Sequence, residues 1–124
     1  MRDQICDGFL NYARTGSMDY FWAFEAVTEL AFQQDWDELW EITLRLIDLA
    51  PFEETELLAI IAAGPLEHLV RYAAPQVEQR IVERIAVDPK FRRVLTGVWA
   101  RQERKDFWDR ITPLLYEYPT EPID

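Results

Sequence analysis

Apolar residues recur along the chain at the three- and four-residue spacing of a helix face, and no segment alternates with the two-residue period of a strand. The pattern predicts an all-α fold of about eight short helices, stacked as antiparallel hairpins in a small solenoid or an irregular bundle. We expect one helical domain over residues 1–118 and a frayed C-terminal tail over residues 119–124, where two prolines interrupt any pattern.

The first three helices are predicted from their apolar faces and their caps. The first covers residues 3–14, and Ser17 is expected to cap the second. The third covers residues 35–50, because Pro51 cannot continue a helix and disfavours helical geometry at the residue before it. A wide apolar stripe that begins at Trp36 predicts that this third helix is central in the fold.

Prolines and one glycine mark the predicted boundaries of the later helices. Proline fits the first turn of a helix because its missing N–H would be unpaired there, and glycine suits the left-handed residue that follows a helix. The predicted boundaries are Gly64 at the end of the fourth helix, Pro65, Pro75 and Pro89 in the first turns of the fifth, sixth and seventh, and Pro113 as a kink or an end in the eighth.

The formal charge of −10 lies entirely in the first half of the chain. Residues 1–63 hold thirteen Asp or Glu against only Arg2, Arg14 and Arg45, whereas residues 64–124 hold ten acidic and ten basic residues. Such a field repels the phosphates of nucleic acids and anionic membranes, and it attracts basic protein surfaces. The expected partner is therefore a basic protein, with no direct nucleic-acid binding and no membrane.

The acidic residues gather in the stretch "QQDWDELWEIT" and at the start of the next predicted helix. Trp36 and Trp40 face one way on a helix, while Asp37 and Glu41 form a second stripe about 100° away. Acids in a first helical turn also complement the positive end of the helix. These acids can therefore be explained either by helix stabilisation or by a docking surface for a basic partner. The predicted partner-binding residues are Asp35, Asp37, Glu38, Glu41, Glu53, Glu54 and Glu56.

The sequence contains few of the residue combinations that form catalytic or metal sites. His68 is the only histidine and Cys6 the only cysteine, so a His–His metal motif, a disulfide within the chain and a thiolate zinc site are excluded. Asp37 and Glu41 could share a divalent ion, but the di-metal bundles need two Glu-x-x-His motifs. We expect no enzyme activity, no cofactor and no metal. Cys6 is interpreted as a core or semi-buried residue, and His68 either as a partly buried polar residue or as a surface residue near Arg71 and Tyr72.

A basic segment spans residues 90–105, where six basic residues accompany only Glu103. It has three interpretations: a solvated basic face, a nucleic-acid-binding patch, or one half of a head-to-tail contact with the acidic half of another copy. We favour the solvated face because the rest of the chain is acidic. The basic residues are Lys90, Arg92, Arg93, Arg101, Arg104 and Lys105.

Two segments, "AAGPLEHLV" at 62–70 and "DPKFRRVLTGVW" at 88–99, resemble a family of small bacterial helical proteins with an uncharacterised domain. Its members carry a Gly-Pro-Leu-Glu motif and a later Asp-Pro-x-Phe-Arg motif that ends near Gly-x-Trp. His68 departs from the acidic residue expected after the Glu. The resemblance implies no assigned activity. Small acidic helical proteins of this kind are similar, by analogy, to immunity proteins that neutralise toxins in bacterial competition.

These observations favour a non-catalytic, acidic protein that neutralises a basic partner, most concretely an immunity protein against a nuclease-type toxin. The alternatives are a nucleic-acid-mimicking inhibitor or regulatory protein, for example phage-derived, a self-associating structural protein, and a carboxylate enzyme. We expect a cytoplasmic location, because residues 1–10 lack the basic and apolar regions of a signal peptide, and no apolar run approaches the roughly 18 residues that span a bilayer.

Overall fold

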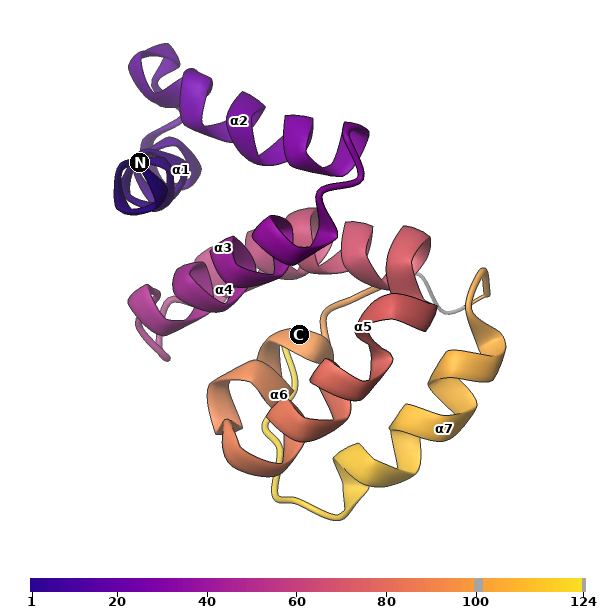
Figure 1. Cartoon of the computed structure of the whole chain (residues 1–124). Helices are drawn as coiled ribbons and strands as arrows, with labels where there is room; N and C mark the ends of the chain where they lie inside the picture. The colour runs from indigo at the N-terminus through magenta and orange to yellow at the C-terminus, as the bar shows by residue number, and fades with distance from the viewer. Residues whose placement is uncertain (100–101, 124) are drawn as a thin grey trace.

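The computed structural model describes residues 1–99 and 102–123 of the chain, so Arg101 and Asp124 lie outside the described residues. The all-α prediction is confirmed, because the described residues form helices and no strand. They form six continuous helical segments instead of about eight (Figure 1). The elements are α1 (Arg2–Thr15), η1 (Met18–Tyr20) with α2 (Phe21–Phe32), α3 (Trp36–Leu49), α4 (Thr55–Ile61) with η2 (Ala62–Leu66) and α5 (Glu67–Val87), α6 (Pro89–Leu95), and α7 (Lys105–Tyr116).

A close contact joins α1 to α2. A Cβ atom added to Gly8 would lie 2.6 Å from the Cβ of Ala23, so only glycine lets the two helices approach this closely. Gly16 ends α1 in the left-handed conformation at φ 68°, and its N–H donates to the carbonyl of Tyr12. Ser17 caps the short helix η1, because its side chain accepts from the N–H of Asp19. These residues fix how the chain turns from α1 into α2.

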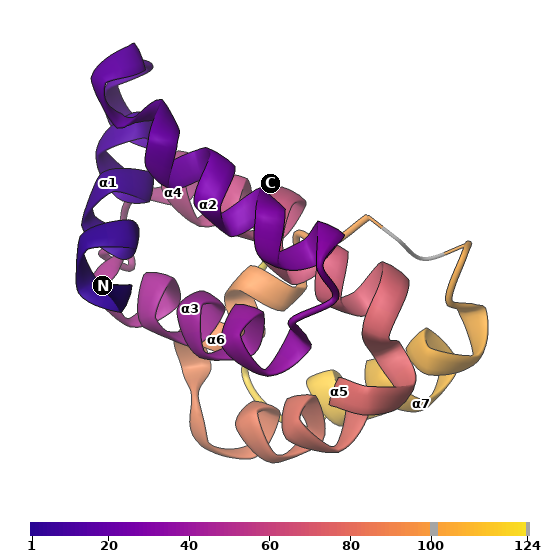
Figure 2. The same ribbon diagram turned by 45° about the horizontal axis from the view of Figure 1, so that its top comes forward.

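Helix α3 is central, as the sequence predicts. Asp35 caps it by accepting from the N–H of Glu38 at 3.4 Å. Its apolar stripe is completely buried at Leu39, Leu46 and Ile47. The helix contacts α1, α2, α4, η2, α5 and α6, and Figures 1 and 2 show it between the N-terminal pair of helices and the C-terminal helices.

The predicted helix ends at Gly64 and Pro75 are wrong, because one helical segment runs from Thr55 to Val87. Around Pro65 the helix widens into the π-turn η2, in which the N–H of Glu67 donates to the carbonyl of Ala62, five residues earlier. Pro75 is accommodated by a kink at Ala73, whose φ is −132°. Both are recognised ways for a helix to pass a proline. Burial of the apolar residues on either side keeps the chain helical where local rules predict an end.

Among the described helices, the segment Thr55–Val87 alone is long and apolar enough to cross a membrane by length and composition, whereas no such run was predicted from the sequence. Of its most apolar window, 56% is buried within the protein. Packing in the core therefore accounts for this hydropathy.

The last described residues lie against α6. Pro113 stays within α7, which continues to Tyr116. In the segment expected as a tail, Thr120 donates to the carbonyl of Tyr118 at 3.2 Å. The N–H of Ile123 donates to the hydroxyl of Thr96 at 3.1 Å, and Ile123 packs on the core.

Candidate partner-binding surface

Four of the predicted binding residues lie at the N-terminal end of α3, around a shallow depression that Arg2 and Arg80 also line. Glu38 accepts two hydrogen bonds from the guanidinium of Arg2, at 2.9 and 2.7 Å, and these bonds hold the pKa of its carboxyl below the usual value. Asp37 pairs with Arg80 at 2.5 Å. Glu41 is exposed and forms no ion pair within the described residues. Two of the four acids in this cluster, Asp37 and Glu38, are therefore neutralised by an arginine.

The other three predicted residues, Glu53, Glu54 and Glu56, lie beyond the opposite end of α3. The 14 residues of α3 span roughly 21 Å at 1.5 Å per residue, so the structure separates the predicted set into two clusters. Glu54 accepts two hydrogen bonds from Arg14, both at 3.0 Å, and these lower the pKa of its carboxyl. Glu53 and Glu56 are exposed, with no ion pair in the part of the chain that is described.

The division of charge along the sequence is not a division in space. Two bases of the second half lie beside α3: Arg80 pairs with Asp37, and Arg84 with Asp48 at 3.5 Å. Each Lys or Arg in the described ranges forms an ion pair or donates to a backbone carbonyl. Eight exposed acids of the first half have no ion pair in the same ranges: Asp7, Asp19, Glu25, Glu29, Asp35, Glu41, Glu53 and Glu56.

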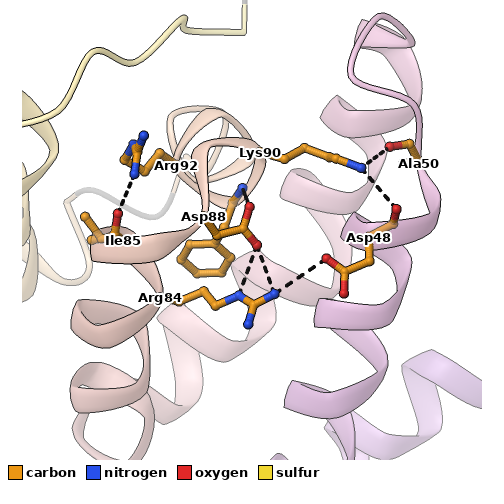
Figure 3. Close-up of polar contacts among 8 residues, drawn as sticks. Asp48, Ala50, Arg84, Ile85, Asp88, Lys90 and Arg92 are labelled. Carbon is orange, nitrogen blue, oxygen red and sulfur yellow. Dashed lines mark hydrogen bonds and ion pairs between the residues drawn. The ribbon is translucent and has the colours of Figure 1, made fainter.

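The basic segment joins helix ends, so its interpretation as a solvated face is wrong for most of its residues. Lys90 donates to the carbonyls of Asp48 and Ala50, at 3.0 and 2.7 Å, where α3 ends (Figure 3). Buried Arg92 donates to the carbonyl of Ile85 at 2.7 Å, in the last turn of α5. Cations at these positions satisfy terminal carbonyls and complement the negative helix end.

Two further arginines of this segment also donate to backbone carbonyls, but not at helix C-termini. Buried Arg93 donates to the carbonyl of Phe52 and to the hydroxyl of Thr55 at 3.2 Å. Arg104 donates to the carbonyl of Arg71 at 2.7 Å. That carbonyl lies four residues before Pro75, which has no N–H to offer it, so Arg104 supplies the missing donor. Lys105 is exposed and pairs with Asp109 at 3.0 Å.

Sequence reasoning missed an aromatic groove of about 470 Å³ between the end of α2, the start of α3 and the first half of α5. Phe32 is 79% exposed and Tyr72 56% exposed, and His68 stacks on Tyr72 with ring centroids 6.1 Å apart. His68 is half-buried, which is the first of its two predicted interpretations, and burial lowers the pKa of its imidazole. The residues that line this aromatic groove are Thr28, Ala31, Phe32, Gln34, Trp36, His68, Tyr72 and Gln76.

Gln34 forms the turn at one end of the aromatic groove. Its φ of 58° lies in the left-handed region that favours glycine. The N–H of Gln34 donates to the carbonyl of Ala31, and the N–H of Asp35 to that of Leu30, which is the Schellman pattern at the end of α2. This turn sets Phe32 and Trp36 on the same groove. The polar run "QQD" after Phe32 was the one sequence signal that the chain turns there and leaves Phe32 outside.

Cys6 is a core residue, as predicted. It is fully buried, its Sγ lies 3.9 Å from the carbonyl oxygen of Ile42, and burial raises the pKa of its thiol to about 11. Among the described residues, no group of three or more His, Cys, Asp or Glu side chains is arranged to hold a metal ion.

Comparison with known proteins assigns the family. The model of a family of unknown function, DUF6869, matches residues 11–117. The chain belongs to DUF6869. The membership of an uncharacterised family is thus confirmed. No curated protein and no solved structure matches the chain.

Proposed function

We propose that this DUF6869 protein is a non-catalytic acidic binding protein that neutralises a basic protein partner. The most concrete form of this proposal is a bacterial immunity protein that acts in the cytoplasm against a nuclease-type toxin, whose nucleic-acid cleft is positively charged. The observation that carries it is the set of eight exposed carboxylates in the first half, for which the described ranges provide no ion-pair partner.

The use of the bases supports this proposal. Because Lys90, Arg92, Arg93 and Arg104 donate to carbonyl oxygens, these cations are not available to the exposed acids. The eight exposed acids therefore keep their negative field. Such a field speeds the encounter with a basic surface and selects against acidic partners.

In this proposal, the Gly-Pro-Leu-Glu and Asp-Pro-x-Phe-Arg motifs stabilise helix junctions and do not contact the partner. Pro65 lies in the widened turn η2, and Glu67 accepts from the N–H of Trp99 at 3.1 Å. Asp88 caps α6 by accepting from the N–H of Phe91 at 3.0 Å. We assign these residues to helix junctions and the partner contact to the acidic surface.

The test is affinity capture from a host lysate, followed by binding measurements with the captured chain. A first variant reverses three unpaired acids, Glu41→Lys, Glu53→Lys and Glu56→Lys. A matched control reverses three exposed acids of the second half, Glu83→Lys, Glu117→Lys and Glu121→Lys, with the same change in net charge.

We expect a basic protein that high salt releases, and an association rate about tenfold lower for the first variant than for the control. Equal rates for the two variants would contradict the placement of the surface. Capture of no basic protein would contradict the function itself. If nucleic acid competes for the captured chain, the partner is a nucleic-acid-binding protein, as both the nuclease and the mimic proposals require.

A further inference from the structure

Helix α2 is apolar on nearly every side, yet the described structure covers only part of it. Nine of the twelve residues in its sequence "FWAFEAVTELAF" are apolar, but only Ala23 and Val27 are buried. A helix that is apolar all round is normally buried on all sides. Figure 1 shows α2 along one edge of the molecule, and in Figure 2, where this edge is turned toward the viewer, no described helix lies in front of it. One face of α2 is therefore open to a partner.

Four exposed side chains form one narrow stripe on this open face, with a ring at each end and two carboxylates between the rings. At about 100° per residue they lie within about 80° of one another around the helix axis, on the side roughly opposite to Ala23 and Val27. The ring at one end is 48% exposed and the ring at the other 79% exposed. The members of this α2 stripe are Trp22, Glu25, Glu29 and Phe32.

The two carboxylates of the α2 stripe keep their charge. Neither Glu25 nor Glu29 has an ion pair within the described residues, and α2 itself contains no Lys or Arg. Glu29 accepts from the amide of Gln33 at 3.0 Å, but this donor is neutral and leaves the negative charge in place. The two acids are one helical turn apart, so they repel each other, and a base bound beside them would relieve that repulsion.

The bases of the chain itself are a poor match for the α2 stripe. Each Lys or Arg in the described ranges already forms an ion pair or donates to a backbone carbonyl. A second copy would therefore have to break one of these contacts to pair with Glu25 or Glu29, whereas a different protein with free bases would break none. This difference favours a foreign basic partner over self-association.

We propose that the α2 stripe binds a basic amphipathic helix of the partner protein. This inference rests on the proposed function, because it names the surface that contacts the basic partner and the kind of segment that fits it. Trp22 and Phe32 are ten residues apart, or roughly 15 Å along the helix axis. A second helix lying along α2 has the same rise per residue, so two of its apolar residues ten positions apart reach both rings. Bases three and seven positions after the first apolar residue then lie opposite Glu25 and Glu29.

The spacing along the α2 stripe is the same in both directions. The intervals from Trp22 to Phe32 are three, four and three residues, so a partner helix can run parallel or antiparallel to α2. An uncharged apolar helix would cover the two rings, but it would also bury the carboxylates of Glu25 and Glu29 without a donor. A Lys or Arg side chain has an apolar stem that packs beside the rings and a charged end for the carboxylates.

The test uses a designed peptide, so it needs no natural partner. A helical peptide of about 17 residues, built on alanine and glutamine, carries two Leu residues ten positions apart and Lys three and seven positions after the first Leu. A matched peptide has Gln at both Lys positions. Each is titrated into isotope-labelled protein, and the indole N–H of Trp22 is followed by NMR. We expect saturable shifts with the Lys peptide and binding about fivefold weaker with the Gln peptide. Equal binding of the two peptides, or no shift at Trp22 with either, would overturn the proposal.

Charge variants separate the α2 stripe from the general acidic field. Glu25→Gln with Glu29→Gln should weaken binding of the Lys peptide about fivefold, because both carboxylates of the stripe are lost. Glu53→Gln with Glu56→Gln is the matched control, since it makes the same change in net charge at two exposed acids outside the stripe, and it should leave binding unchanged. Equal weakening by the two double variants would show that the overall field attracts the peptide, and would overturn the stripe as the site.

A ring variant tests the apolar end of the α2 stripe. Phe32→Ala removes a side chain that is 79% exposed, so the fold should persist while binding of the Lys peptide falls several-fold. Tyr116→Ala, at a ring 85% exposed on α7, is the control and should leave binding unchanged. Equal binding by the two variants would show that Phe32 is not an anchor and would overturn the proposed position of the helix.

Failure of this inference and failure of the proposed function give different results. If lysate capture returns no basic protein while the Lys peptide binds at Trp22, the neutralising function is overturned and the α2 stripe is supported as a binding surface. If a basic protein is captured but binds the Glu25→Gln, Glu29→Gln variant as tightly as the unaltered protein, the function is supported and the α2 stripe is overturned.

Discussion

At the scale of single residues, burial decides the chemistry of Cys6. The thiol is fully buried, and burial raises its pKa from 9.0 to about 11. Since the folded state holds the proton more tightly, this thiol's contribution to the free energy of unfolding is complete below pH 9.0 and is lost as the pH rises from 9.0 to about 11.

We therefore expect Cys6 to resist alkylation in the native protein. Only the thiolate reacts, and the native structure both lowers its amount and covers the sulfur. Mass spectrometry after iodoacetamide treatment at about pH 8 should show an unmodified chain without denaturant and complete modification in urea. Native labelling as fast as labelling in urea would contradict the buried position.

Gly8 is a second residue whose identity the packing requires. In a Gly8→Ala variant the new methyl group would lie 2.6 Å from the Cβ of Ala23, so α1 and α2 must move apart. We expect the free energy of unfolding to fall by about 1–3 kcal/mol, measured by urea denaturation, as for other overpacked positions. Gly64→Ala is the matched control, since nothing lies within 4 Å of its added Cβ, and it should be neutral or slightly stabilising. Equal losses in both variants would show that the contact with Ala23 is not the cause.

At the scale of elements, side chains donate hydrogen bonds to helix carbonyls that have no N–H partner within their own helix. Pro75 leaves the carbonyl of Arg71 without its helical donor, and Arg104 supplies one from the start of α7. The kink in α5 and the position of α7 are therefore coupled. Lys90 likewise donates to two carbonyls at the end of α3, those of Asp48 and Ala50.

A double-mutant cycle tests this coupling. Arg104→Gln should lower the free energy of unfolding by about 1–2 kcal/mol, because a half-buried carbonyl loses its charged donor. In a Pro75→Ala background the N–H of the new alanine can reach the carbonyl of Arg71, so the same change should cost less. Lys105→Gln, at an exposed ion pair, is the control and should change little. Additive effects of Pro75→Ala and Arg104→Gln would mean that the two residues act independently.

At the scale of the whole molecule, the unpaired acids repel one another. The formal charge is −10, and most described ion pairs are exposed, where they contribute little. We expect the free energy of unfolding to rise by about 0.5–1 kcal/mol when NaCl increases from roughly 20 to 300 mM, because salt screens this repulsion. Urea denaturation at several salt concentrations measures it. Glu41→Gln, Glu53→Gln and Glu56→Gln together should reduce the salt dependence, and a fall in stability with salt would show that the ion pairs dominate.

Local rules predicted α3 closely. Its predicted range of 35–50 compares with Trp36–Leu49, and Asp35, predicted as its first residue, is its N-cap. The same rules failed from residue 55 to 87, where two prolines predicted helix starts and the chain passes both within one helical segment. They failed because a proline destabilises a helix only locally. Burial of the apolar residues on both sides in the core stabilises the helical segment by a larger free energy.

The candidate site was predicted in part. The acids themselves were named, but the pairing of Glu38 with Arg2 and of Glu54 with Arg14 joins residues 36 and 40 positions apart. The aromatic groove draws its rings from three elements, so no single helix face carries its pattern. Likewise, Arg92 and Arg93 look like surface charges in sequence and are buried in the structure.

The sequence by itself determined that the protein is helical, where several helices begin, and that its first half holds the excess of acids. Each of these properties depends on residues within a few positions of one another or on composition. Only the tertiary structure decided which charges stay exposed and which rings meet in a groove. Those outcomes depend on distances between remote residues, and it is distance and burial that set whether a charge is neutralised or a ring is covered.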